Sequence, residues 1–422
     1  MYDAIAREVV SRCRLLAACS DEPGFTTRTF LSESMRQVHA EVSRWMAEAG
    51  MRVRVDAAGN IRGVHAAASD TARRLYIGSH LDTVPHAGAF DGVLGVVMGI
   101  ALVGSLRGRR LPFGIEVVGF SEEEGVRFGL PFIGSRAMAG DVDAALLATT
   151  DASGTSIAEA IGHFGLDASR MADARAASNP LGYLEFHIEQ GPVLEARQQP
   201  VAIVDRIVGR TYADVTFIGS AGHAGTTPMD ARWDALTGAA EWVGCVEAHA
   251  RRTGGLVATI GRIDAAPGAA NVIAGQCRVT LDVRHGDDET RNAAIGRLRA
   301  AANEIAERRG LTVEWSSRFD HAAVAMDPAL VALLARAVER AGVTPHVMSS
   351  GAGHDAMILA PHMPAAMLFI RTPGGLSHHP DEAVMEGDVA VALAAGANVL
   401  DELAGGGGAE AGDGSEDPPL HR

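Results

Sequence analysis

The chain has 422 residues, which is more than one hydrophobic core usually supports, so we expect two domains. Its 47% hydrophobic and 21% charged residues are the ordinary composition of a soluble globular protein. The formal net charge of -15 argues against nucleic acid and against an anionic membrane as partners, because both attract basic patches.

The cysteines and apolar segments favour a cytoplasmic protein. The chain contains four cysteines, Cys13, Cys19, Cys245 and Cys277. None has CxxC spacing, so we expect free thiols in a reducing compartment. Arg12 and Arg14 interrupt the short apolar patch that ends at residue 19, which disfavours a secretory signal. The apolar segment 93–106 is too short to cross a bilayer.

In chain order, the first 210 residues alternate between helical and strand patterns. Residues 1–50 carry apolar side chains at helical spacing and end at Gly50, a residue typical of helix C-caps. The expected strands are 51–55, 61–64, 75–77, 113–120, 181–188 and 200–210. A continuous apolar run at 93–106 predicts a buried helix, whereas 125–180 shows no clear periodicity.

The pattern changes after residue 210. Strand, helix, two strands, helix and strand are expected in that order at 212–218, 230–251, 256–263, 272–283, 288–309 and 311–315. This order is typical of a compact α+β layer that folds by itself. A helix after Pro328, a strand at 366–370 and a helix at 387–403 then resume the earlier pattern.

We therefore predict an α/β fold in two parts. A mixed-sheet α/β domain formed by 1–210 and 328–403 is interrupted by an inserted α+β (β-α-β-β-α-β) domain at 211–327. Residues 404–422, which are rich in glycine, acidic residues and proline, are expected to form a disordered tail.

The loop before the predicted helix at 93–106 holds a histidine and two aspartates. Open α/β sheets place their ligands at such strand ends. His80 and Asp91 provide an imidazole and a carboxylate, which suit zinc, manganese or cobalt. Asp82 can accept the other ring N–H of His80 and so fix its tautomer.

Other strand ends and one late loop carry further candidate ligands. The run Glu122-Glu123-Glu124 follows a buried strand, where adjacent carboxylates repel unless a metal ion compensates. A solvated acidic turn is the alternative for this run. Taken singly, a histidine at the position of His187 is more often a surface or packing residue than a ligand, and His378 could equally lie in an exposed turn. Their occurrence together, in this order, favours a metal site.

The order of these residues resembles a known metal site. His80-x-Asp82, Asp91-Gly92, Glu123-Glu124-Gly125, His187 and His378 are similar to the dinuclear site of the M20 peptidase and amidase family. Five further segments are similar to the hydantoinase/carbamoylase branch of this family. They are Glu124-Gly125-x-Arg127-Phe128-Gly129, Gly134-Ser135-Arg136, His187-Ile188-Glu189-Gln190-Gly191-Pro192, Gly222-His223-Ala224-Gly225-Thr226-Thr227-Pro228-Met229 and Ser377-His378. That branch includes N-carbamoyl-L-amino-acid hydrolases, allantoate amidohydrolases and ureidopropionases. The resemblance covers roughly residues 5–402.

The resemblance implies two bound divalent ions, of zinc, manganese or cobalt. The implied ligands are the bridging Asp91 together with His80, Glu124, His187 and His378. Glu123 would be the general base that takes a proton from a water between the ions, and Asp82 is counted with it as catalytic. Glu122 would have either a supporting role behind the ligands or a solvated position.

The inserted domain is implied to contribute to the site as well. His223 would reach the active site of the other subunit and hold the developing oxyanion, so the resemblance implies a homodimer. Arg284 would grip an α-carboxylate, with Asn271 also holding the substrate. Gln190 would read a ureido or amide group, and Gly353 would offer its backbone. A surface loop for His223 and a water-facing strand position for Asn271 or Arg284 are the alternatives.

Together these residues predict a metal-dependent amidohydrolase that cleaves the carbamoyl C–N bond of N-carbamoyl-L-amino acids. An allantoate amidohydrolase or a ureidopropionase is the nearest alternative, since allantoate also pairs a ureido group with a carboxylate. A non-catalytic binding protein of the same fold is a lesser alternative, which the complete ligand set disfavours. The expected partner is a small molecule, and hinge closure is expected to bring the two domains' residues together. No function is assigned to His86.

Overall fold

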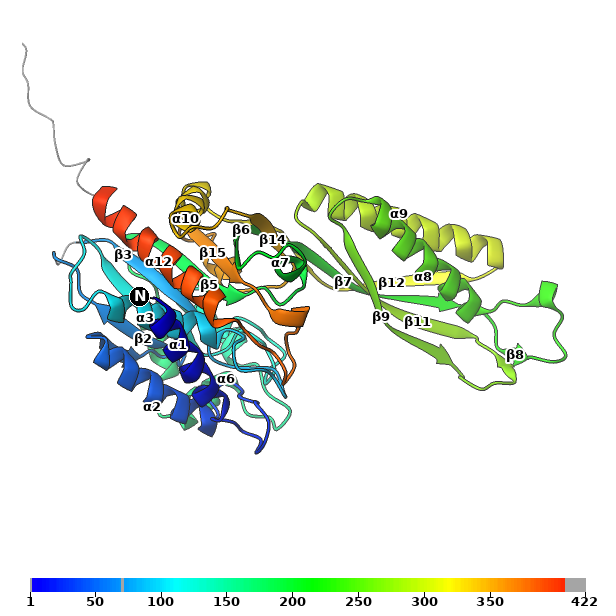
Figure 1. Cartoon of the computed structure of the whole chain (residues 1–422). Coiled ribbons are helices and arrows are strands. Elements are labelled where there is room, and N and C mark those ends of the chain that lie inside the picture. Colours follow the sequence, from blue (N-terminus) through cyan, green and yellow to red (C-terminus); the bar gives the residue numbers. More distant parts are fainter. Residues whose placement is uncertain (1, 70–71, 407–422) are drawn as a thin grey trace, which may run out of the picture. The chain divides into compact units, whose positions relative to one another are not determined.

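The computed structural model describes residues 2–69 and 72–406, and these form two compact units (Figure 1). The first unit comprises the described residues of Met1–Asp205, Met326–Met348 and His354–Arg422. The second comprises Arg206–Ala325 and Ser349–Gly353. Each unit has its own hydrophobic core.

The first unit is built on a mixed sheet. Its strands are β1 (Arg52–Val55), β2 (Ile61–His65), β3 (Arg74–His80), β4 (Gly114–Phe120), β5 (Pro180–Ile188), β6 (Val201–Ile207), β14 (Val347–Ser350) and β15 (Ala365–Ile370). They are ordered β1-β2-β4-β3-β5-β15-β6, and β14 also pairs with β6. Because β3 runs parallel to β4 and β5, the carboxyl ends of these three strands meet at one edge. Ligands of α/β proteins bind at such an edge.

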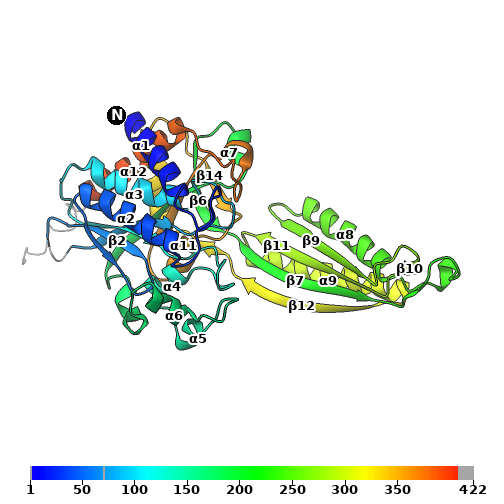
Figure 2. The ribbon, with the colours of Figure 1, turned by 90° about the horizontal axis from the view of Figure 1, so that it is seen from below.

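Helices cover both faces of this sheet. The longer helices are α1 (Tyr2–Ala17), α2 (Glu33–Glu48), α3 (Val93–Ser105), α10 (Pro328–Arg340) and α12 (Glu386–Gly406). The shorter ones are α4 (Ile133–Ala139), α5 (Ala144–Leu147), α6 (Ile157–His163), α7 (Val193–Ala196), α11 (Asp355–Leu359), η1 (Ala168–Ala174) and η3 (Pro373–Gly375). Figure 2 shows α1, α3 and α12 on one side of the sheet and α4, α5 and α6 on the other.

Helix α3 lies directly on the strands that carry the candidate ligands. It packs against β3, β4 and β5, and α1 covers its other side. A Cβ atom at Gly95 would lie 2.1 Å from the backbone oxygen of Phe186 in β5, so only glycine permits this approach. The close packing places the start of α3, and Asp91 just before it, beside the ends of the strands.

The second unit is an antiparallel sheet with two helices on one face (Figure 1). Its elements are β7 (Gly209–Ile218), β8 (Gly222–His223), η2 (Met229–Ala231), α8 (Ala235–Arg252), β9 (Val257–Ala266), β10 (Val272–Ile273), β11 (Gln276–His285), α9 (Asp288–Arg309), β12 (Thr312–His321) and β13 (Val324–Ala325). The sheet is ordered β12-β7-β11-β9. Alternate residues of β7 and β11, such as Phe217 and Leu281, are buried against α8 and α9. The helices are joined by a hydrogen bond from Nε1 of Trp242 to the carbonyl oxygen of Leu298.

The predicted fold class is confirmed, with differences in detail. The predicted strand 272–283 is divided into β10 and β11, and the strand predicted at 311–315 extends to His321. Helix α12 continues to Gly406, so 404–406 are helical instead of disordered, because Ala404 packs on the core. The rest of the predicted tail lies outside the described residues. Within 2–69 and 72–406, no helix combines the length and apolar character needed to cross a membrane.

Candidate metal centre

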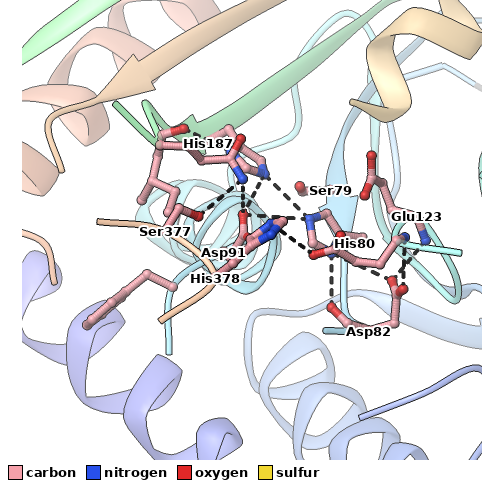
Figure 3. Close-up of polar contacts among 12 residues, drawn as sticks. Ser79, His80, Asp82, Asp91, Glu123, His187, Ser377 and His378 are labelled. Carbon is pink, nitrogen blue, oxygen red and sulfur yellow. Dashed lines mark hydrogen bonds and ion pairs between the residues drawn. The ribbon is translucent and has the colours of Figure 1, made fainter. Parts of the chain in front are cut away.

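Several predicted ligands meet at the carboxyl edge of the first unit's sheet (Figure 3). His80 is the last residue of β3, His187 lies near the end of β5, and Asp91 immediately precedes the turn into α3. Glu124 follows β4, and His378 follows η3. All of these side chains are largely buried except that of His378, which is half exposed.

The two oxygens of Asp91 face two different sets of ligand atoms. Oδ1 lies 3.3 Å from Nε2 of His187 and 4.0 Å from Nε2 of His80. Oδ2 lies 3.1 Å from Nε2 of His378, and that nitrogen lies 3.5 Å from Oε1 of Glu124. In each set, the ligand atoms lie within 4.8 Å of one another. One carboxylate shared by two ligand sets is the arrangement of a dinuclear metal site.

The imidazole tautomers suit metal binding. Nδ1 of His80 lies 3.0 Å from the backbone oxygen of Asp82, and Nδ1 of His187 lies 2.9 Å from that of Ile188. A carbonyl oxygen only accepts, so each Nδ1 carries the proton and each Nε2 presents a lone pair. The two Nε2 atoms lie 3.5 Å apart. Two neutral nitrogens that face one another in this way suit a cation between them.

A second observation supports the fit of divalent ions to this site. Oδ2 of Asp91 is buried, and apart from its contact with Nε2 of His378 it accepts no hydrogen bond within the described part of the chain. A buried carboxylate oxygen with so few donors is costly, and a cation reduces that cost. Imidazole nitrogens together with carboxylates suit zinc, manganese or cobalt.

Gly92 is required where the site loop turns into α3. Its φ of 68° is in the left-handed region, and a Cβ atom there would lie 2.4 Å from the His80 ring. Any other residue would therefore displace either the backbone or a ligand.

The three consecutive glutamates are not a solvated acidic turn. Glu122 and Glu123 are buried and Glu124 is partly buried, so a solvated position for Glu122 is wrong. Burial, together with the Glu124 carboxylate, raises the pKa of Glu123 well above its usual value. Burial and the Asp91 carboxylate raise the pKa of Glu124 to about 7. The crevice therefore gathers carboxyl groups whose charged forms a divalent cation would stabilise.

Asp82 supports both the predicted base and a ligand. Its Oδ1 accepts a hydrogen bond from the backbone N–H of Glu123 at 2.9 Å, and its Oδ2 accepts one from that of Glu124 at 3.0 Å. The backbone oxygen of Asp82 accepts the Nδ1–H of His80. The Asp82 carboxylate lies farther from this nitrogen, with Oδ1 at 3.6 Å. Asp82 therefore fixes the tautomer through its backbone and the glutamates through its side chain.

Gln190 lies against the bridging carboxylate. Its Nε2 donates to Oδ1 of Asp91 at 3.1 Å and to Oγ of Ser377 at 3.3 Å. Gln190 and His378 both have a positive φ, of 59° and 56°. Non-glycine residues rarely adopt this conformation, and it is concentrated at functional sites.

The other predicted site residues belong to the second unit. His223 in β8 and Asn271 lie side by side on a two-stranded ribbon, because β8 pairs with β10 and the N–H of Ala224 donates to the backbone oxygen of Asn271. Both side chains are exposed. Arg284 lies near the end of β11 and Gly353 in the segment 349–353. Their roles at the metal site stay predictions.

Some residues near the ligands have no signal in the sequence. Glu185 in β5 is buried and accepts hydrogen bonds from Oγ of Ser79 and from the backbone N–H of Ala356. Glu382 is buried beside the site loop. Neither belongs to a pattern of ligand spacing, so only the folded chain shows their place. His86 instead lies at the surface, where it stacks on Phe25 with ring centroids 4.0 Å apart.

A mixed α/β unit with this set of histidines and carboxylates is typical of metal-dependent hydrolases. The comparisons with known proteins agree. The model of the peptidase family M20/M25/M40 matches residues 76–403, so the chain belongs to this family. Its relatives place it in the hydantoinase/carbamoylase branch, and it is a metal-dependent amidohydrolase that acts on C–N bonds.

Both curated and solved relatives span nearly the whole chain. The chain is 39% identical to N-carbamoyl-L-amino acid amidohydrolase of Geobacillus stearothermophilus, over 89% of this chain and 92% of that protein. It is 37% identical to allantoate deiminase of Arabidopsis thaliana, over 96% of this chain and 83% of that protein. It resembles the crystal structure of a hydantoinase/carbamoylase family amidase from Burkholderia ambifaria, with a TM-score of 0.88, 34% identity and coverage of 94% and 97%.

Proposed function

We propose that the protein hydrolyses the carbamoyl C–N bond of N-carbamoyl-L-amino acids and releases the free amino acid, ammonia and carbon dioxide. The observation that carries the proposal is that the two oxygens of the Asp91 carboxylate face different ligands. Oδ1 faces His80 and His187, and Oδ2 faces His378. Two divalent ions of zinc, manganese or cobalt held there would polarise the substrate carbonyl and acidify a water.

Glu123 is the proposed general base. Its carboxylate forms a group with the His80 imidazole and the Glu124 carboxylate in which the ligand atoms lie within 4.8 Å of one another, and its backbone N–H is held by Asp82. Glu123 takes a proton from the attacking water and delivers it to the leaving nitrogen. A positioned acid/base of this kind contributes about 10²–10⁴-fold to the rate.

Arg284 is proposed to bind the substrate carboxylate. It lines a cavity of about 540 Å³ within the second unit. Its Nε and Nη2 donate to Asp282 at 3.0 Å each, and its Nη1 donates to the backbone oxygen of Gly351 at 2.6 Å. One N–H remains on each Nη nitrogen, and together these two can still hold a carboxylate in a bidentate manner.

The remaining substrate contacts are proposed on the same basis. Gln190, which donates to Asp91 in this structure, would bind the ureido or amide group once substrate is present. Asn271 and the backbone of Gly353 would complete the binding of the substrate. His223 would stabilise the oxyanion in the partner subunit's site of a homodimer. The free cysteines agree with our proposal that the protein works in the cytoplasm.

Mixed dimers test the proposed exchange of His223 between subunits. In a dimer of one Glu123→Gln chain and one His223→Ala chain, the site with the intact Glu123 would receive the intact histidine of its partner. Equal amounts of the two inactive chains would therefore regain about a quarter of the wild-type activity after subunit exchange, because half of the dimers are mixed and half of their sites are complete. No recovery, despite confirmed exchange, would contradict a shared site.

Allantoate is the second candidate substrate, since an allantoate deiminase is 37% identical over 96% of this chain. Its ureido groups and carboxylate would use the same metal centre and the same Arg284. Release of ammonia from N-carbamoyl-L-methionine, 3-ureidopropionate and allantoate, measured side by side, tests the choice. We expect the highest kcat/KM for the N-carbamoyl-L-amino acid. A preference for allantoate or 3-ureidopropionate would replace the substrate but keep the chemistry, and no turnover of any would contradict the proposal.

A further inference from the structure

Glu382 connects the two loops that carry Asp91 and His378. Its Oε1 accepts hydrogen bonds from the backbone N–H groups of Phe90 at 2.8 Å and Asp91 at 3.0 Å. Its Oε2 accepts one from Oγ of Ser377 at 3.3 Å. The side chain is buried, with 5% of the residue exposed. The Glu382 carboxylate thus holds the backbone of Asp91 and the side chain of Ser377, which precedes His378 in the chain.

The site loop is shaped around Glu382. A Cβ atom at Gly88 would lie 2.3 Å from Cβ of Glu382 and 2.5 Å from its Oε1. Only a residue without a side chain leaves room for the carboxylate to reach the N–H groups of the loop. The hydrogen bonds and the packing therefore agree on one position for Glu382.

His378 needs support of this kind more than the other ligands do. Its side chain is 47% exposed and its φ is 56°, a conformation that a non-glycine residue keeps only when its surroundings hold it. His80 and His187 are instead buried in or at the end of strands, and each is oriented by a backbone carbonyl. Their positions do not depend on Glu382.

A chain of hydrogen bonds extends this connection to the bridging carboxylate. Nε2 of Gln190 donates to Oγ of Ser377, and the Ser377 hydroxyl donates to Oε2 of Glu382. The same Nε2 also donates to Oδ1 of Asp91. Asp91 is therefore held through both its backbone and its side chain, and Ser377 is the common neighbour.

We propose that Glu382 is a positioning residue that builds one of the two ion sites, the one formed by Asp91, Glu124 and His378. Among the described residues, Glu382 belongs to no group of candidate ligand atoms, and its oxygens face N–H and O–H donors. This inference rests on the proposed dinuclear site. It adds that the two ions are held unequally, and that the site with His378 depends on a carboxylate that touches no ion.

Binding of cobalt(II) to the full-length protein, depleted of metal beforehand, tests this proposal. The visible absorption of cobalt and isothermal titration calorimetry together give the number of ions and their dissociation constants. We expect two ions for the wild type. Removing a residue that supports metal ligands typically weakens metal binding about 10–100-fold. Glu382→Ala is therefore expected to raise the dissociation constant of one ion by about that factor and to leave that of the other ion unchanged.

Three further variants separate positioning from general destabilisation. Glu382→Gln keeps an oxygen for the two N–H groups and is expected to bind this ion more tightly than Glu382→Ala does. Ser377→Ala is expected to lower the affinity for the same ion, but by less than Glu382→Ala. Glu195→Ala is the control for loss of a loop contact, because the exposed Glu195 also holds this loop, through the N–H of Gly374, and has no hydrogen bond to a candidate ligand in the described part of the chain. It is expected to bind both ions as the wild type does.

The outcomes are distinguishable even if one variant folds poorly. Unchanged binding in Glu382→Ala, or equal weakening of both ions, would overturn the proposal. If Glu382→Ala does not fold, unchanged binding in Ser377→Ala and Glu382→Gln would do so. Fewer than two ions in the wild type would overturn both this proposal and the dinuclear site. Two ions without hydrolysis of any ureido substrate would overturn only the proposed reaction.

Discussion

Asp82→Asn tests the support of the catalytic glutamates most sharply. The Asp82 carboxylate accepts one N–H from Glu123 and one from Glu124, at 2.9 and 3.0 Å. An amide has one accepting oxygen, so its NH₂ group must face a backbone N–H and one hydrogen bond is lost. A hydrogen bond to a charged acceptor is worth about 1.5–3 kcal/mol.

The expected effect on catalysis follows from that free energy. If the loss shifts the base or the ligand away from its working position, about 1.5–3 kcal/mol corresponds to a decrease in kcat of roughly 10–100-fold. The assay is ammonia release from N-carbamoyl-L-methionine at saturating metal, with thermal unfolding of the same samples. A kcat within twofold of the wild type, in folded protein, would refute the reasoning.

Asp56→Asn is the control for destabilisation by a buried Asp→Asn change. Asp56 is also buried, its Oδ1 accepts the backbone N–H groups of Ala58 at 3.0 Å and Asn60 at 3.1 Å, and its Oδ2 pairs with Nη1 of Arg62 at 3.3 Å, but it holds no candidate ligand. This variant is expected to lower the free energy of unfolding while kcat of the folded fraction stays unchanged. An equal loss of kcat in both variants would mean that destabilisation alone explains the effect.

Three other predictions concern the base, the substrate carboxylate and acid stability. Glu123→Gln is expected to lower kcat by about 10²–10⁴-fold with both ions still bound, and loss of the ions would show that Glu123 is a ligand instead. Arg284→Lys is expected to raise KM about tenfold, because lysine lacks the planar bidentate edge, and an unchanged KM would place the carboxylate elsewhere. Burial and the charge of Arg36 lower the pKa of His39 to about 4, so the folded protein binds that proton less well than the unfolded chain and stability falls with pH below about 6.5. The linkage relation gives a loss of about 2 kcal/mol in the free energy of unfolding between pH 7 and pH 5 from this histidine. In urea unfolding, His39→Leu should lack this loss, and an identical dependence of the free energy of unfolding on pH in both proteins would contradict the prediction.

The sequence was informative where a residue's place depends on local pattern. His80, Glu123 and Glu124 follow apolar strands, so strand periodicity and the rules of α/β sheets predict that they meet at one edge. The order of the ligands along the chain then indicated the family. The fold class and the order of elements in the inserted domain were predictable for the same reason.

Other features depend on contacts that only the folded chain makes. Glu382 reaches Asp91 across 291 residues of sequence, and nothing near it in sequence indicates that contact. The carboxylate of Asp82 contacts backbone N–H groups that are 41 and 42 residues away, although its spacing from His80 suggested the imidazole. Long-range contacts to backbone groups leave no residue pattern, because every residue except proline supplies the same N–H.

The central claim is that two divalent ions share the Asp91 carboxylate. Anomalous diffraction from crystals of the protein grown with zinc tests it most directly. We predict two anomalous peaks flanking Asp91, one contacting His80 and His187 and the other contacting Glu124 and His378. A single peak at Asp91, or ions bound only elsewhere, would contradict the account.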